Sequence, residues 1–279
     1  MLSIKILTIG LTALLLSSCT KEVKGTIKYP TGVDRPSLTP YELNVISDKI
    51  YKNETGGNPK YLMYWSPNEN FASLGIGHFI WYPKNEPRRF DETFPSMIDY
   101  YVANKVKIPT WLLQARKIGA PWRNKEVFER ARNDKEFQQL KNILMNTKAL
   151  QTQFFFDRVN ASIPEIITHV APEYKKHIIS NYNALVNSRG GLYPLIDYIN
   201  FKGKGIKATE RYNNQGWGLL QVLKNMRPVT RGPGALAEFS RVAYLMLKRR
   251  VQNSPIEKNE KRWLPGWKKR TDSYRVSIL

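Results

Sequence analysis

The chain has 279 residues, and its 44 lysines and arginines against 23 aspartates and glutamates give a formal net charge of +21. Its 7 tryptophans and 15 tyrosines exclude a chain that is disordered over most of its length, because disordered chains contain few aromatic residues. A single cysteine excludes an internal disulfide, and the strong positive charge either serves solubility alone or indicates polyanionic surroundings such as anionic lipid, phosphate-bearing polymers or peptidoglycan carboxylates.

The first 18 residues are typical of a secretory signal peptide. Lys5 precedes the apolar run 6–16, and small residues then lead to Cys19. The run is too short for a transmembrane anchor. The stretch LSSC, residues 16–19, resembles the bacterial lipobox, which implies cleavage before Cys19 and a lipid on its thiol. The alternative is an ordinary signal peptide that happens to contain a cysteine.

Residues 19–38 are predicted to be the lipidated cysteine and a polar tether, since prolines and small residues interrupt the stretch. A helix is expected to begin directly after it. Thr39 supplies a capping hydroxyl, Pro40 suits the first helical position, and Glu42 completes a capping box three residues after the cap.

Glu54 continues the apolar face of this predicted helix. It follows Leu43, Ile46 and Ile50 at helical spacing, and the glycine pair 56–57 is typical of a helix end. Burial and the negative end of the helix dipole both disfavour the ionised carboxylate and predict a raised pKa. Such an acid can protonate a leaving oxygen in glycoside hydrolysis. The alternative is a solvated glutamate at a helix end.

The rest of the chain predicts a mainly α (α+β) fold with one small β-hairpin. Aromatic and branched residues at 60–65 and 71–81, separated by the turn sequence SPNEN, predict the hairpin, and residues 83–95 predict a surface loop. Helical patterns follow, with helices expected at 95–105, 109–118, 124–131, 134–148, 150–159, 164–169, 172–187, 191–200, 208–225 and 233–252.

The segment from Glu54 to His78 resembles the lysozyme superfamily, most closely the phage-type lysozymes. In that family a helix ends on the catalytic glutamate, a tyrosine follows seven residues later, and the return strand carries a hydroxyl-apolar-Gly-x-Gly-His signature. Here Glu54 is followed by Tyr61 and by SLGIGH at 73–78. The resemblance implies a lysozyme-like helical domain over residues 39–279, with a helical C-terminal extension and Glu54 as the acid. It also implies that a saccharide cleft is shaped by Tyr61, Trp65, Ser73 and His78.

The chain departs from this family at the second carboxylate. Phage-type enzymes usually place an aspartate two residues after the hairpin tyrosine, where this chain has Met63. Glu69 in the hairpin turn is a candidate substitute, as are Asp91 and Glu92. Alternatively the reaction needs one carboxylate only, because lytic transglycosylases use a single glutamate as acid and then as base.

Two later motifs are weaker. The stretch NALVNSRGG at 183–191 is similar to a later helix-loop-helix of the lysozyme family. The stretch QGWGLLQ at 215–221 resembles a lytic transglycosylase segment, and its Trp217 is either a platform for a sugar ring or an ordinary core residue. Basic residues alternate with tryptophan over 248–275, which favours either an anionic polymer or a solvated basic surface.

Three hypotheses follow. The first is a glycosidase that cleaves the β-1,4 glycan of peptidoglycan, anchored by lipid in the bacterial envelope and facing the periplasm, with the outer membrane favoured over the inner. The second is a non-catalytic envelope protein that binds peptidoglycan with a lysozyme-like fold. The third is a binder of anionic lipid or nucleic acid, although no motif predicts a specific nucleic acid. No cofactor is expected, and no metal either, because His169 and His177 have no nearby cysteine or carboxylate cluster.

Overall fold

The computed structural model describes residues 29–279. It confirms the predicted class, because helices dominate and the strands form one small antiparallel sheet and one two-stranded ribbon. The predicted signal peptide and Cys19 lie outside the described residues. Within residues 29–279, no helix has the length and apolar character needed to cross a bilayer.

The helices and strands have the following bounds. The helices are α1 (Pro40–Thr55), α2 (Phe94–Ala103), α3 (Thr110–Ile118), α4 (Lys125–Arg130), α5 (Lys135–Asn146), α6 (Lys148–Thr168), α7 (Pro172–Val186), α8 (Leu192–Lys202), α9 (Leu219–Asn225), α10 (Pro233–Asn253) and α11 (Leu264–Asp272). The strands are β1 (Met63–Tyr64), β2 (Ala72–Leu74), β3 (Phe79–Trp81), β4 (Arg211–Tyr212) and β5 (Gln215–Gly216).

Helix α1 begins and ends where the sequence predicts. The Thr39 hydroxyl accepts from the Glu42 amide at 3.2 Å, while the Glu42 carboxylate accepts from the Thr39 amide at 2.9 Å. Both bonds satisfy amides that an uncapped helix would leave without a partner. Gly56 ends the helix in the left-handed conformation, at φ 61°.

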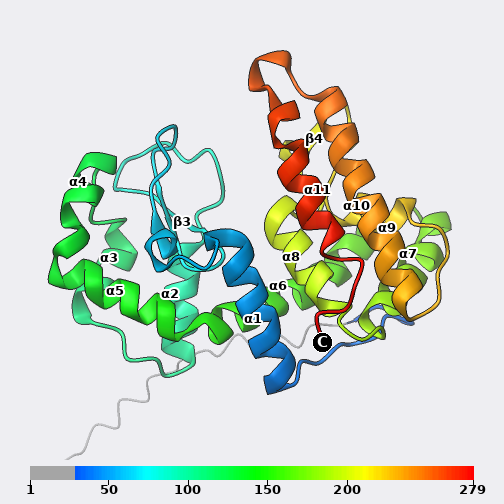
Figure 1. Ribbon diagram of the computed structural model, residues 1–279, viewed down its shortest axis with the longest axis horizontal. Coiled ribbons are helices and arrows are strands. Elements are labelled where there is room, and N and C mark those ends of the chain that lie inside the picture. Colours follow the sequence, from blue (N-terminus) through cyan, green and yellow to red (C-terminus); the bar gives the residue numbers. More distant parts are fainter. Residues whose placement is uncertain (1–28) are drawn as a thin grey trace, which may run out of the picture.

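Two lobes lie on either side of α1 and α6. Figure 1 shows α2 to α5 with the three-stranded sheet on one side, and α7 to α11 on the other. One apolar core runs through both lobes. Helix α6 is a single helix, whereas two helices were predicted at 150–159 and 164–169, with Pro164 at the start of the second, so the predicted break is wrong. Apolar side chains are buried before and after the proline, including Phe156, Ile163 and Ile167, and their packing outweighs the lost backbone hydrogen bond.

The predicted hairpin is a sheet of three antiparallel strands in the order β1-β2-β3. Met63 pairs with Leu74, and Leu74 pairs with Phe79, so the second predicted strand is folded back on itself. The turn that does this contains Gly75 and Gly77. A Cβ on Gly77 would lie 1.8 Å from the Phe155 ring of α6. The missing side chain therefore makes room for the close approach of α6 and not for a substrate.

The C-terminal lobe corrects two further expectations. The predicted helix 208–225 is a 3₁₀ turn, the β4–β5 hairpin and then α9. Asn213 and Asn214 both have positive φ, at 47° and 59°, which is the backbone of a tight hairpin turn. Helix α11 was not predicted at all.

Residues 29–38, predicted as part of a tether, lie along α7. The Asn183 side chain accepts from the Asp34 amide at 3.0 Å and donates to the Gly32 carbonyl at 2.7 Å. The Asn187 side chain donates to the Asp34 carboxylate at 2.6 Å, and Val33 is buried. This stretch is therefore part of the folded body.

Candidate functional site

Glu54 sits in the last turn of α1, where three elements meet. Its side chain is only 12% exposed. One carboxylate oxygen accepts from the Arg270 guanidinium at 2.5 Å, and the other lies 3.5 Å from Nδ1 of His78. Helix α1, the β2–β3 turn and α11 therefore place a carboxylate, an imidazole and a guanidinium side by side.

Arg270 is held in place by a second, fully buried carboxylate. Its Nε and Nη2 donate to the two oxygens of Asp197, at 2.7 and 2.8 Å, while Nη2 also reaches Glu54. Asp197 belongs to α8 and is 1% exposed, and it also accepts from the Tyr274 hydroxyl at 2.5 Å. Burial opposes the charge of Arg270, but Asp197 and Glu54 outweigh it and raise the pKa of the guanidinium further.

The ion pair is a contact that the sequence argument for Glu54 did not include. That argument considered burial and the helix dipole, whereas in the structure Arg270 donates a charge-assisted hydrogen bond to the carboxylate. A substrate that reaches Glu54 therefore has to compete with this guanidinium for the carboxylate oxygen.

A second polar contact joins the same elements. Asn53 donates from its amide nitrogen to the Tyr193 hydroxyl at 2.8 Å, and that hydroxyl lies 2.9 Å from the Ser273 hydroxyl. These residues come from α1, α8 and the end of α11. Burial, followed by the charge of Asp197, raises the pKa of Tyr193, so its hydroxyl stays neutral.

Lys202 adds a further cation beside this network. Its ammonium nitrogen lies 3.8 Å from the ring centroids of both Phe201 and Trp267, and the Arg270 guanidinium lies 4.1 Å from the Phe201 centroid. Burial lowers the pKa of Lys202 well below its usual value, and the neighbouring charges of Arg250 and Arg270 act in the same direction.

Tyr61, Ser73 and His78 are all at least partly exposed, but only His78 contacts Glu54. Tyr61 is 42% exposed and packs edge-to-face against Tyr64. Ser73 lies on β2, paired with Tyr64 and Ile80. His78 has φ 48°, which turns the chain between β2 and β3 and brings its ring to Glu54. Its Nε2 is buried, with no hydrogen-bond partner in the described part of the protein.

Trp65 and Trp217 are core residues, which corrects their expected role as sugar contacts. Trp65 is 2% exposed, packs on Phe128, and donates from its indole to the Glu69 carbonyl at 2.8 Å. Trp217 is 4% exposed and is covered by Tyr212 and by the Arg250 guanidinium. Neither indole presents a free face to a substrate.

Glu69 is at the wrong end of the sheet to be the second carboxylate. It lies in the β1–β2 connection, whereas His78, which contacts Glu54, lies in the β2–β3 turn. In antiparallel strands these two connections are at opposite ends. The other substitutes are also occupied: Asp91 pairs with Lys207, and Glu92 accepts from the Tyr82 amide and pairs with Arg88.

Sequence reasoning missed Asp197, Arg270 and Tyr274, although one signal was present. Asp197 is an isolated carboxylate in the apolar run LYPLIDYI, and a buried acid in such a helix requires a cationic partner. The partner itself lies 73 residues further along the chain. Nothing in the basic run around Arg270 distinguishes that residue from its neighbours.

Between residues 29 and 279, no group of three or more histidine, cysteine or acidic side chains is arranged to hold a metal ion. Comparisons of the chain with protein-family models, with curated proteins and with solved structures gave no match. The residues around Glu54 are therefore the basis for assigning a function.

Proposed function

We propose that the protein is a lysozyme-like glycosidase that cleaves the β-1,4 glycan of peptidoglycan, with Glu54 as the acid. The observation that carries this proposal is the position of Glu54. A largely buried carboxylate at the end of α1 lies between the β2–β3 turn and the opposite lobe. The resemblance of residues 54–78 to phage-type lysozymes supports the same role.

The surrounding residues have distinct tasks in this mechanism. Arg270 holds the Glu54 side chain in place before substrate arrives, through a hydrogen bond of 2.5 Å. Glu54 donates a proton to the glycosidic oxygen as the bond between that oxygen and the anomeric carbon breaks. The carboxylate that results is stabilised by Arg270 and accepts a proton from the hydroxyl that then attacks the anomeric carbon, which belongs to water in hydrolysis or to the sugar itself in anhydro-forming cleavage. His78 lies close enough to orient Glu54.

The cellular setting belongs to the same proposal. A lipid on Cys19 would hold the enzyme in the bacterial envelope, where peptidoglycan is the available β-1,4 glycan. The net charge of +21 would favour the anionic envelope through long-range attraction.

A specific observation favours a second candidate, a non-catalytic protein that binds peptidoglycan. Met63, which occupies the position of the missing aspartate, is 1% exposed, and Glu54 is the only acidic side chain that pairs with His78 in residues 29–279. An enzyme of this design would depend on one carboxylate.

Turnover of purified peptidoglycan separates the two. The full-length protein should release muropeptides, and Glu54→Gln should lower the rate by a factor of about 10² to 10⁴, the usual contribution of a general acid. Glu69→Gln is the matched control, because that carboxylate lies at the far end of the sheet, and it should keep its activity. Release of muropeptides at equal rates by wild type and Glu54→Gln would refute Glu54 as the acid, and release by neither would refute the enzyme. Mass spectrometry of the products distinguishes hydrolysis from anhydro-forming cleavage.

A further inference from the structure

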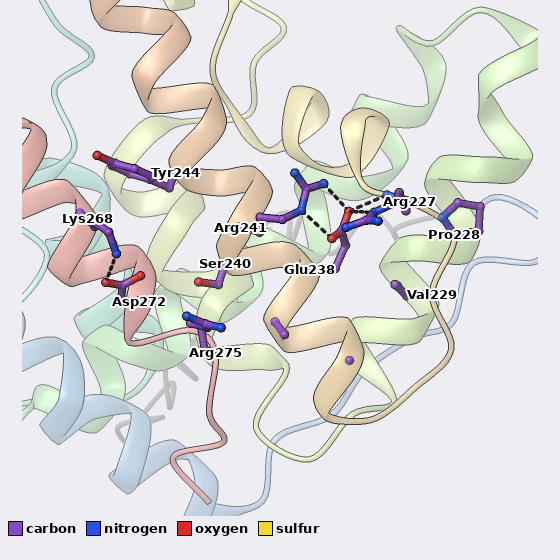
Figure 2. Close-up of a pocket in the computed structure, with 12 residues that line it drawn as sticks. Arg227, Pro228, Val229, Glu238, Ser240, Arg241, Tyr244, Lys268, Asp272 and Arg275 are labelled. Atoms are coloured by element: carbon purple, nitrogen blue, oxygen red, sulfur yellow. Dashed lines mark hydrogen bonds and ion pairs between the residues drawn. The ribbon is translucent and has the colours of Figure 1, made fainter.

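A furrow runs between α10 and α11 on the other side of α11 from Glu54. Its first part is a cavity of about 640 Å³, shown in Figure 2, which continues into a second cavity of about 560 Å³. Tyr244, Lys268 and Asp272 line both. We call the two together the α10–α11 furrow, whose charged lining residues are Arg227, Glu238, Arg241, Lys268, Lys269, Asp272 and Arg275.

Glu238 holds the side chains of Arg227 and Arg241 in place, but its single charge does not neutralise both guanidinium groups. It is 8% exposed and accepts from Nε and Nη2 of Arg241 at 2.8 and 2.7 Å, as well as from the Arg227 amide at 2.8 Å. The side chains of Arg227 and Arg241 remain 75% and 47% exposed. Both can therefore bind a further anion with their outer edges.

The remaining groups leave the furrow positive. Lys268 donates to Asp272 at 2.6 Å, so these two charges balance each other. Arg275 is exposed and forms no ion pair with any acidic residue in the described chain. Five cations therefore face two carboxylates in the furrow, and the guanidinium of Arg275 is free for a ligand.

The furrow is long for a small ligand. Gly234 and Tyr244 line the first cavity and are ten residues apart on α10, which corresponds to about 15 Å along the helix axis. The ammonium groups of Lys248 and Lys268 lie 5.7 and 5.6 Å from the centroid of the Tyr244 ring. An occupant that uses the full length carries several anionic groups.

We propose that the α10–α11 furrow binds an extended polymer that carries repeated phosphate groups. Guanidinium groups from the 227–229 loop, from α10 and from the end of α11 line one volume. A tetrahedral phosphate can accept from several such donors, whereas one arginine fork already matches a planar carboxylate. Tyr244 is the only aromatic lining residue, so the furrow offers no series of platforms for nucleic-acid bases.

The furrow is separate from the Glu54 site, and its ligand does not depend on the proposed function. Lys268, Asp272 and Arg275 are four and three residues apart, so they share one face of the α11 segment. Arg270 leaves the helix in a different direction, toward Asp197 and Glu54. Binding in the furrow can therefore be measured apart from peptidoglycan cleavage.

The test uses the full-length protein and inorganic polyphosphate as the probe, with affinity measured by isothermal titration calorimetry at several salt concentrations. The double variant Arg227→Gln, Arg275→Gln should bind about 10- to 30-fold more weakly, at about 1 kcal/mol for each basic contact. The slope of the logarithm of the binding constant against the logarithm of the salt concentration should decrease in size by about two, because two fewer phosphate charges are neutralised. The matched control, Lys107→Gln with Arg123→Gln, removes two exposed cations from the other lobe and should bind nearly as wild type.

Other probes make the proposal falsifiable. Orthophosphate and polyglutamate should bind much more weakly than polyphosphate, and Glu54→Gln should bind polyphosphate as wild type does. Equal loss of affinity in both double variants would show an effect of net charge alone and would overturn the proposal that the polymer binds in the furrow. If oligothymidine binds more tightly than polyphosphate with an equal number of charges, the proposed ligand is wrong and nucleic acid is favoured instead. Circular dichroism verifies that each variant is folded.

Discussion

Glu238 contributes to stability through a charge that is almost completely enclosed. The hydrogen bond from Arg241 is the largest effect, and it lowers the pKa of Glu238 from 4.5 to about 2 despite burial. Because the folded state binds this proton less readily than the unfolded state, the contribution is complete above about pH 5 and is lost as pH falls toward 2. A shift of this size corresponds to about 3 kcal/mol.

We therefore expect Glu238→Gln to lower the free energy of unfolding by a few kcal/mol at pH 7 and to have little effect near pH 2. Urea denaturation at pH 7, 4 and 2.5 measures this difference. A constant difference across the three pH values would contradict the assignment.

At the scale of single residues, the sequence predicted that Glu54 lies on the buried face at the end of a helix, because helical spacing and the glycine pair that follows define this position locally. The prediction that Trp65 and Trp217 contact a sugar was less successful, since both side chains are buried. A tryptophan next to glycine or in an aromatic run suits a binding surface and a core equally well. Arg270 could not be predicted, because it acts on Glu54 across 216 residues of sequence.

The turn between β2 and β3 depends on the absence of a side chain at Gly77. A methyl group there would meet the Phe155 ring at 1.8 Å, and that ring is stacked on Phe79 at a centroid distance of 5.1 Å. We expect Gly77→Ala to lower the free energy of unfolding by about 1 to 3 kcal/mol, the usual cost of overpacking. It should also displace His78 from Glu54.

Thermal unfolding followed by circular dichroism tests this prediction. Gly266→Ala is the matched control, because a Cβ at Gly266 on α11 meets no atom within 4 Å. That control should be neutral or slightly more stable, since alanine favours the helix. Equal melting temperatures for Gly77→Ala and the control would show that the close approach to Phe155 is unimportant.

At the scale of elements, long and strongly periodic segments were predicted well, as α1, α7 and α10 show. The sequence misled where a local rule competed with packing. Pro164 suggested a helix break, but α6 continues because both of its halves are buried between the lobes. The helical pattern over 208–225 concealed the Asn213-Asn214 turn. The basic run before Tyr274 gave no apolar stripe from which α11 could be identified.

At the scale of the whole molecule, the cluster of Asp197, Arg270 and Glu54 joins α8 and α11 of one lobe to α1, from which Glu54 also contacts His78 in the sheet of the other lobe. Replacing Asp197 by asparagine removes the charge that pairs with the buried guanidinium and leaves one acceptor oxygen, where Arg270 and Tyr274 now share two. We expect Asp197→Asn to cost about 3 to 5 kcal/mol of unfolding free energy, as for other broken buried ion pairs. Replacing both partners should cost less than the sum of the single changes.

A double-mutant cycle of Asp197→Asn and Arg270→Met, measured by urea denaturation, determines the coupling. A coupling energy near zero would mean that the two side chains stabilise the protein independently.

The sequence predicted a single helical domain over residues 39–279, and the mainly helical class is confirmed. It could not predict the way the lobes face each other, because contacts such as the Asn53–Tyr193 bond span 140 residues.

The strand-like stretch that precedes α1 has a practical consequence for preparing shorter forms of the protein. Cutting the chain at Thr39, where regular structure begins, would expose the pocket of Val33 and deprive Asn183 and Asn187 of their hydrogen bonds. A protein that starts at or before Tyr29 keeps these contacts. Yields of folded protein and melting points of truncated versions should therefore drop between these two starting points rather than at the first turn of helix.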